Sequence, residues 1–173
     1  MAETTFFTFA RRDILEWGDI PFLLLVAALI RSDSVPHYDP RYLAGVLLFN
    51  GGDYFEAHEV WEDLWSEAHG VERKFYQGLI QAAVGLCHFV NGNLGGAVKL
   101  YHSSRGYLEP CGTQVLGLDL PGFLRQMDKC FHDLLANSAG RIEFDPQKQP
   151  LLQLDPEPES WPDPARYLPE DES

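Results

Sequence analysis

The sequence predicts an all-α protein, a multi-helix bundle of antiparallel helical hairpins followed by an extended acidic C-terminal tail. Apolar residues recur at the spacing of an amphipathic helix in successive segments, and glycine- or proline-containing turns separate these segments. No alternating strand pattern occurs between Tyr38 and Ala139. The 173 residues, 45% of them hydrophobic, suffice for one domain with its own core. We divide the chain into an N-terminal extension (1–37), a helical bundle domain (38–140) and a proline- and acid-rich tail (141–173).

The N-terminal extension contains one apolar segment, Ile20–Ile30, which predicts a helix. Its longest apolar run is only half as long as the roughly 20 residues needed to cross a bilayer, so we expect no membrane span. Asp13, Glu16 and Asp19 interrupt the flank that a secretory signal would need. We therefore expect a cytoplasmic protein, or one of the plastid stroma.

The first two helices of the bundle are marked by their capping residues. Asp39 followed by Pro40 is typical of an N-cap and a first helical position, and the Asn-Gly-Gly of residues 50–52 predicts where that helix ends. Asp53 is then placed to cap a second helix, Tyr54–Ala68.

Three further helices follow at similar spacing. One runs from about Glu72 to Val90 and is apolar or small nearly all round, which is typical of a central helix. Asn93 is placed to cap the next helix, Leu94–Leu108. Pro121 opens the last one, whose apolar residues keep the helical period at Phe123, Leu124, Met127, Phe131, Leu134 and Leu135.

The composition excludes some classes of function. The net charge is −13, from 13 Lys and Arg against 26 Asp and Glu, and no cluster of basic residues occurs. An acidic surface repels phosphate backbones, so we expect no nucleic-acid partner. The odd number of cysteines, Cys87, Cys111 and Cys130, and the lack of a CxxC pair predict free thiols in a reducing compartment.

Polar residues on two adjacent predicted helices indicate a pocket between them. His58 and Glu62 lie one helical turn apart, at the edge of the buried face of Tyr54–Ala68. The otherwise apolar helix Glu72–Val90 carries a single polar stripe after its first turn. Buried amides and imidazoles need hydrogen-bond partners, so we expect the two sets to meet. The predicted polar pocket consists of His58, Glu62, Gln77, Gln81 and His88.

The chemistry of this pocket has three interpretations. His58, Glu62 and His88 could bind a divalent metal, although HEVWE lacks the second histidine of the HExxH motif. His58 and Glu62 could act instead as an acid–base pair on a small ligand. In the structural interpretation Glu62 accepts a hydrogen bond from His58, and the glutamines tie the helices together.

The pattern favours a non-enzymatic helical binding or protein-interaction module with a polar pocket between helices, with a protein or a small ligand as partner. The acidic surface and the glycine-containing hairpins support this prediction. The alternative is a metal-binding protein or metal-dependent hydrolase that uses His58, Glu62 and His88, and a divalent metal is then its only expected cofactor. Trp61 and Trp65 are interpreted as core or groove anchors. The sequence leaves the oligomeric state open.

Two segments, FNGGDYFEAHEVWEDLW and FYQGLIQAAVGLCHFVNGNLGGAVKLY, resemble the bacterial and plastid domain-of-unknown-function family three hundred and nine. The resemblance covers about Tyr42 to Leu108. It implies a small all-helical bundle and brings no established activity. The family's motif positions in this chain are Asn50, Gly52, Phe55, His58, Glu59, Glu62, Trp65, Gln77, Gly78, Gln81, His88, Gly92 and Asn93.

Overall fold

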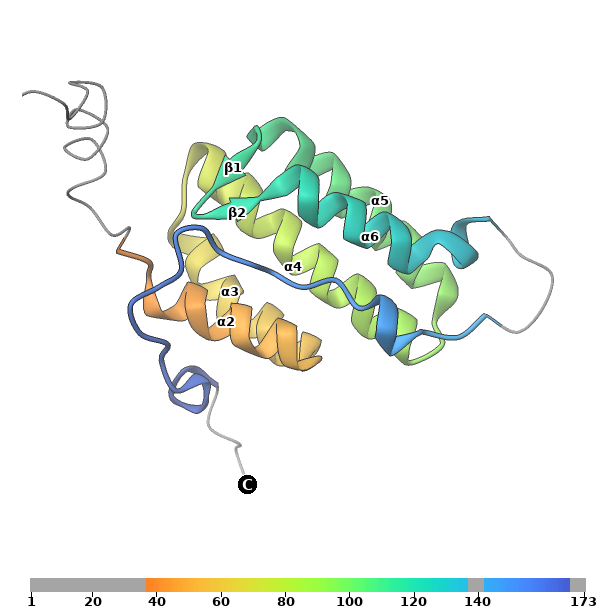
Figure 1. The fold of residues 1–173 in the computed structure, drawn as a ribbon, viewed down its shortest axis with the longest axis horizontal. Helices are drawn as coiled ribbons and strands as arrows, with labels where there is room; N and C mark the ends of the chain where they lie inside the picture. The colour runs from red at the N-terminus through yellow and green to blue at the C-terminus, as the bar shows by residue number, and fades with distance from the viewer. Residues whose placement is uncertain (1–36, 137–141, 169–173) are drawn as a thin grey trace, which may run out of the picture. The chain divides into compact units, whose positions relative to one another are not determined.

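The computed structural model describes residues 37–136 and 142–168, and the predicted helix Ile20–Ile30 lies outside them. This part of the chain is a helical bundle, as predicted (Figure 1). Its α-helices are α2 (Pro40–Gly51), α3 (Tyr54–Glu67), α4 (Gly70–Val90), α5 (Leu94–Leu108) and α6 (Leu120–Leu135). The short 3₁₀ helices are η1 (Glu109–Cys111), η2 (Pro146–Lys148) and η3 (Pro164–Tyr167).

The capping residues were predicted in the right places, but not all of them make capping bonds. The Asp39 carboxylate accepts from the backbone N–H of Arg41, and the Asn93 side chain accepts from that of Gly96. Asp53 also stands at an N-cap position, yet its side chain makes no capping hydrogen bond, so that part of the prediction is wrong. Backbone conformation does not explain the difference, because Asn93 caps α5 with nearly the same φ and ψ as Asp53.

Helix α4 lies between α3 and α5 (Figure 1) and carries much of the core. Ten of its 21 residues are buried. Two glycines let α5 approach closely: a Cβ on Gly78 would lie 2.5 Å from Leu108 Cγ, and one on Gly85 would lie 3.3 Å from the Leu100 Cβ. The buried Ser104 hydroxyl donates to the Gly78 carbonyl at 2.8 Å. The α4–α5 hairpin is therefore closely packed, with glycines of α4 facing leucines of α5.

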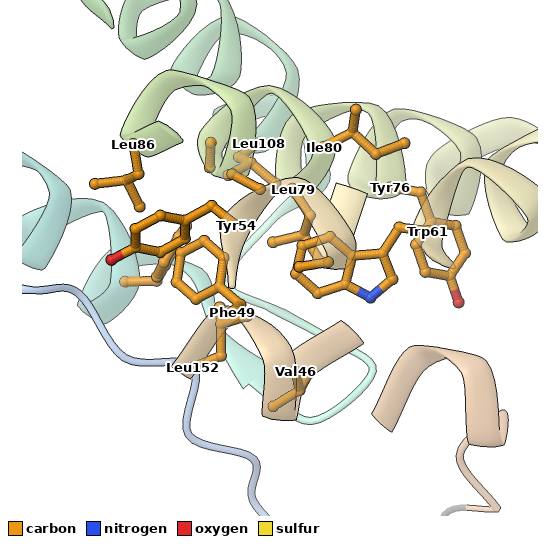
Figure 2. Packing of buried hydrophobic residues seen from close by; sticks show 14 of the residues in the cluster. Val46, Phe49, Tyr54, Trp61, Tyr76, Leu79, Ile80, Leu86, Leu108 and Leu152 are labelled. Atoms are coloured by element: carbon orange, nitrogen blue, oxygen red, sulfur yellow. The ribbon is translucent and has the colours of Figure 1, made fainter. Parts of the chain in front are cut away.

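Aromatic side chains from several helices meet in the centre of the core (Figure 2). The ring of Phe49 lies 5.4 Å from that of Tyr54, 6.0 Å from that of Trp61 and 5.9 Å from that of Phe123, measured between centroids. Such tilted and edge-on pairs add to the stabilisation that burial alone provides. Phe49 thereby joins α2 to α3 and α6.

A small antiparallel hairpin precedes α6, so the expectation of no strands was wrong at this point. Strand β1 (Gln114–Val115) pairs with β2 (Leu118–Asp119). Leu116 and Gly117 between them both have positive φ, 46° and 78°, as tight two-residue hairpin turns require. Strands of two residues are too short to give an alternating pattern, which is why the sequence did not reveal them.

The C-terminal segment 142–168, here called the strap, runs between α2 and α6 in largely extended form (Figure 1). Leu152 of the strap is only 2% exposed, and Phe144 and Leu154 pack against the core. Leu154 bridges to Leu118, and the Asp155 N–H donates to the Gly117 carbonyl at 2.8 Å. The strap therefore contributes apolar side chains to the core between two helices.

Two side-chain amides hold the strap by pairing with its backbone. Asn50 at the end of α2 donates to the Leu152 carbonyl at 2.9 Å and accepts from the Leu152 N–H at 2.8 Å. From the other side, Gln126 of α6 accepts from the Leu151 N–H at 2.9 Å and donates to the Leu151 carbonyl at 3.3 Å. Each amide thus replaces a neighbouring strand by satisfying both backbone groups of one residue.

Asn50→Ala should lower the free energy of unfolding by about 1–3 kcal/mol, because it leaves the N–H and carbonyl of a buried residue without partners. Urea denaturation measures the loss, and amide hydrogen exchange at Leu152 should accelerate. Gln153→Ala, at an exposed strap position with no side-chain hydrogen bond among the described residues, is the matched control and should be nearly silent. Equal effects of the two substitutions would contradict the assigned role of Asn50.

Candidate functional site

The five residues of the predicted polar pocket lie on α3 and α4. His58, Gln77, Gln81 and His88 are partly buried, and Glu62 is exposed. On α4 the three polar residues and Val84 are spaced to share one face of the helix. At its C-terminal end this face approaches α5, since a Cβ on Gly96 would lie 3.0 Å from the His88 ring.

The predicted residues contact other parts of the chain rather than one another. The His58 ring Nδ1 contacts the Phe55 carbonyl, and the His58 and Phe55 rings stack edge-on at 4.6 Å. His88 Nδ1 lies 3.2 Å from the Asn93 side-chain nitrogen. Within residues 37–136 and 142–168, no hydrogen bond joins His58 to Glu62, so the predicted bond between them is absent. His58 and Glu62 are spaced to meet, but the His58 imidazole contacts the backbone carbonyl of Phe55, one turn earlier, instead.

The metal interpretation finds no support in the geometry. Among the described residues, no group of three His, Cys, Asp or Glu side chains is arranged to hold a metal ion, and His58, Glu62 and His88 are no exception. A divalent transition metal needs at least three such protein ligands around one point. The metal-dependent alternative with His58, Glu62 and His88 stays a prediction from the sequence.

Gln81 is the residue of the stripe whose side-chain oxygen lacks a hydrogen-bond donor within the described part of the chain. Its side-chain oxygen is buried and accepts no hydrogen bond from any described residue; the Tyr54 hydroxyl is the other such atom in this part of the chain. An unsatisfied buried carbonyl carries a desolvation cost of about 1–3 kcal/mol. The stripe thus presents one acceptor that the described fold leaves without a donor.

The two helices that pack against α4 carry large side chains with exposed apolar surface. Phe55 of α3 is 53% exposed, and Tyr107 of α5 is 38% exposed with its Cβ close to Gly78. Trp65 is partly buried, and the Arg73 guanidinium lies 4.0 Å above its ring and donates to its backbone carbonyl at 2.8 Å. We define the outer face as Phe55, His58, Trp65, Gln77, Gln81, Val84, His88 and Tyr107.

Arg73 was not singled out from the sequence. It lies in the first turns of α4 and bonds to the carbonyls at the end of α3, which would otherwise lack partners. A basic residue shortly after a predicted helix end was the signal available for it. Because Arg73 of α4 stacks on Trp65 of α3, that tryptophan helps to join the two helices.

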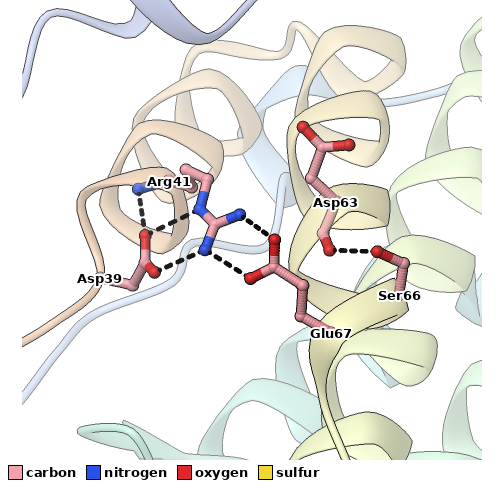
Figure 3. A network of polar contacts seen from close by, with 5 residues as sticks. All are labelled: Asp39, Arg41, Asp63, Ser66 and Glu67. Carbon is pink, nitrogen blue, oxygen red and sulfur yellow. Dashed lines mark hydrogen bonds and ion pairs between the residues drawn. The ribbon is translucent and has the colours of Figure 1, made fainter.

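A polar clamp joins α2 to α3 on another side of the bundle (Figure 3). Arg41 donates two hydrogen bonds of 2.9 Å to the Glu67 carboxylate and pairs with Asp39 at 3.0 Å. The Arg41 hydrogen bonds lower the pKa of Glu67. Burial raises the pKa of Asp39, but the hydrogen bonds from Arg41 together outweigh it and the net pKa lies below its ordinary value.

Arg41→Gln should reduce stability at neutral pH and matter less in acid. Both carboxylates have lowered pKa values in the folded state, so their contribution is present above the ordinary carboxyl pKa and is lost as the pH falls through the folded values. The difference in unfolding free energy between wild type and variant should therefore shrink below about pH 4. Urea titrations between pH 7 and pH 3 measure it; a constant difference would contradict the assignment.

A second cluster joins α5 to α6. The Tyr101 hydroxyl donates to Asp128 at 2.6 Å, and Arg105 pairs with both Asp128 and, at 2.6 Å, Glu109. Burial, together with the hydrogen bond to Asp128, raises the pKa of Tyr101 to about 12. The sequence offered no signal for this cluster, because Asp128 lies 27 residues after Tyr101. Its groups satisfy one another, which is typical of a structural link.

The comparisons with known proteins identify the family. The model of a domain of unknown function, DUF309, matches residues 42–100. The chain is similar to the uncharacterized protein YpuF of Bacillus subtilis (strain 168), with 35% identity over 120 residues, or 67% of this chain and 69% of that protein. It is also similar to an uncharacterized protein of Aquifex aeolicus (strain VF5), with 32% identity over 104 residues and only 31% of that protein covered. The chain belongs to the DUF309 family.

These relatives carry no assigned activity, so the function of the chain is unknown and has to be argued from its own residues. None of the helices described above is both long enough and apolar enough to span a membrane.

Proposed function

We propose that this protein is a helical interaction module whose partner covers the outer face of α3, α4 and α5. The observation that carries the proposal is the unpaired Gln81 oxygen on α4, a helix whose packed neighbours α3 and α5 carry the partly exposed large side chains of Phe55 and Tyr107. Apolar anchors around one polar group are the usual content of a recognition surface. A donor from the partner would meet Gln81 if its amide turned outward.

The charge of α3 favours a basic partner. This helix carries no Lys or Arg and five acids, namely Glu56, Glu59, Glu62, Asp63 and Glu67. Of these, Glu67 alone forms an ion pair within the described part of the chain. An amphipathic helix with Lys or Arg beside its apolar anchors would complement this surface.

Photo-crosslinking from single positions tests the proposal. A photoreactive phenylalanine analogue replaces Tyr107 on the outer face, and in a second variant it replaces Leu151 on the strap. The two native side chains are 38% and 39% exposed, so they are matched in accessibility. In cells that make the native protein, we expect one crosslinked protein from position 107 and none of it from position 151. Mass spectrometry should place the crosslink near Lys or Arg residues of that protein.

The control is a variant that keeps the fold and removes an anchor. Phe55→Ser should leave the thermal unfolding temperature nearly unchanged, because the side chain is mostly exposed, and should abolish the crosslink from position 107. Crosslinking that is equal from both positions, or unaffected by Phe55→Ser, would refute an outer-face partner. A crosslink between two copies of this chain would show self-association in place of a basic partner.

The compartment is part of the same proposal. Cys87, Cys111 and Cys130 are all free in the structure, and Cys130 is buried. Free thiols are typical of a reducing compartment, so we propose that the protein works in the cytoplasm.

A further inference from the structure

A second, separate pocket lies where the strap passes the beginning of α2. It encloses about 400 Å³, within the usual range of small-ligand sites. Its walls are anchored by contacts that do not depend on a ligand. The Tyr38 hydroxyl donates to the Pro156 carbonyl at 2.8 Å, and Pro158 is buried. The Asp163 side chain accepts from the Ala165 N–H at 3.1 Å and so caps η3.

Aromatic residues and prolines make up much of the lining of this pocket, and its other polar side chains are those of His37, Glu159 and Ser160. Three aromatic residues, Tyr38, Trp161 and Tyr167, contribute to it, and much of the rest is proline. The Trp161 side chain is 38% exposed, so part of its large ring is accessible to a ligand. The hydroxyl of Tyr38 is already engaged by Pro156. A ligand with many polar groups would find few partners here.

The charge around the pocket is negative. Glu159 lines it and no Lys or Arg does, so His37 is the one lining side chain able to carry a positive charge. Asp155 lies close enough that its carboxylate, after the larger effect of burial, raises the pKa of Tyr38. The nearest base along the strap, Arg166, is 80% exposed at its side chain and 4.0 Å from Asp163. A positively charged ligand would be attracted, and an anion repelled.

Aromatic faces with a single carboxylate suit a particular kind of cation. The negative face of an aromatic ring attracts a cation, and tryptophan does so most strongly. A primary ammonium needs hydrogen-bond acceptors for its three N–H groups, which proline and aromatic walls do not provide. A methylated ammonium has no such need, because its charge is spread over apolar methyl groups.

We propose that the pocket formed by Tyr38, Glu159, Trp161 and Tyr167 binds a quaternary ammonium group. The group could belong to a small molecule of the choline type or to a trimethylated lysine side chain, since both present the same chemistry. This site is independent of the outer face proposed above, and it lies on different elements of the fold. Ligand binding here would rest on Trp161 for cation–π attraction and on Glu159 for charge.

Titrations of the full chain test this proposal. NMR follows the indole N–H of Trp161, one of four tryptophans, while choline or tetramethylammonium is added. We expect a saturable shift of this resonance. Dimethylbutanol, the neutral carbon isostere of choline, should bind at least about fivefold more weakly because it has the same shape without the charge. A trimethyllysine peptide and its unmethylated form distinguish a peptide source from a small molecule.

Two substitutions separate the chemistry from the fold. Trp161→Leu keeps an apolar side chain but removes the aromatic face, so choline binding, followed by calorimetry, should weaken about tenfold. Glu159→Gln keeps the shape and removes the charge, and it should weaken choline but not dimethylbutanol. Leu151→Ala, equally exposed elsewhere on the strap, should change neither. Equal binding of choline and dimethylbutanol, or no saturable shift with any cation, would overturn the proposal.

Discussion

Trp61→Ala should lower the free energy of unfolding by about 3–5 kcal/mol, the range measured when a buried large aromatic residue is truncated. The Trp61 side chain is completely buried, and its ring meets Phe49 at the centre of the core (Figure 2). Its indole N–H also donates to the Tyr42 carbonyl at 3.3 Å. Guanidinium denaturation monitored by circular dichroism measures the loss. Trp65→Ala is the matched control and should cost much less, because that side chain is only partly buried.

The position of Trp61 depends on Gly45, which makes a sharper test possible. A Cβ on Gly45 would lie 2.1 Å from the indole nitrogen, so even alanine cannot fit while the tryptophan is in place. Gly45→Ala should therefore destabilise wild type by several kcal/mol and cost far less in the Trp61→Ala background. Additive effects in this double-mutant cycle would show that the two residues do not compete for the same space.

Leu152→Ala should lower the free energy of unfolding by about 2–4 kcal/mol, because it leaves a cavity where the strap enters the core. The neighbouring Leu151→Ala should change it by less than about 0.5 kcal/mol, since that side chain is 39% exposed. The two substitutions delete the same atoms from adjacent residues. Any difference between them therefore reports burial and not chemistry.

The outcome that would contradict this prediction is a silent Leu152→Ala. It would mean that the strap leaves α2 and α6 readily in solution. Hydrogen exchange decides the point directly, because the N–H of Leu152 bonds to Asn50 and that of Leu151 to Gln126. Both should be protected as strongly as the core helices if the strap is part of the cooperative unit.

The helices could be predicted from the sequence because their signals are local. Asp39 and Asn93 each bond to a backbone N–H two or three residues later, and the periodicity of α6 follows from its own buried residues. The strap shows the opposite case. Leu152 is an apolar residue in an acidic, proline-rich segment, and its partner Asn50 is 102 residues away. No local pattern announces such a pairing, although docking of the tail's leucines was foreseeable in general.

The candidate site was predicted in part, for a related reason. Helical spacing placed Gln77, Gln81 and His88 on one face of α4, and all three are partly buried there. Spacing also placed His58 beside Glu62, but it gives only proximity and not the choice of partner. The Phe55 carbonyl lies one turn before His58 and is available on any helix, so the imidazole bonds locally. The aromatic pocket beside the strap depends on long-range packing and was not foreseen.

The pairing of Asn50 with Leu152 also has a consequence for how the protein is made. A ribosome synthesises the chain from the N-terminus, so helices α2 to α6 are complete before residue 152 exists. Until then, the apolar side chain of Phe49 lacks the leucine that lies beside it in the core, and the nascent bundle exposes surface to which chaperones or other nascent chains bind. Synthesis that stops in the loop after α6 would leave the protein in this state permanently. The strap therefore couples completion of the polypeptide to completion of the core.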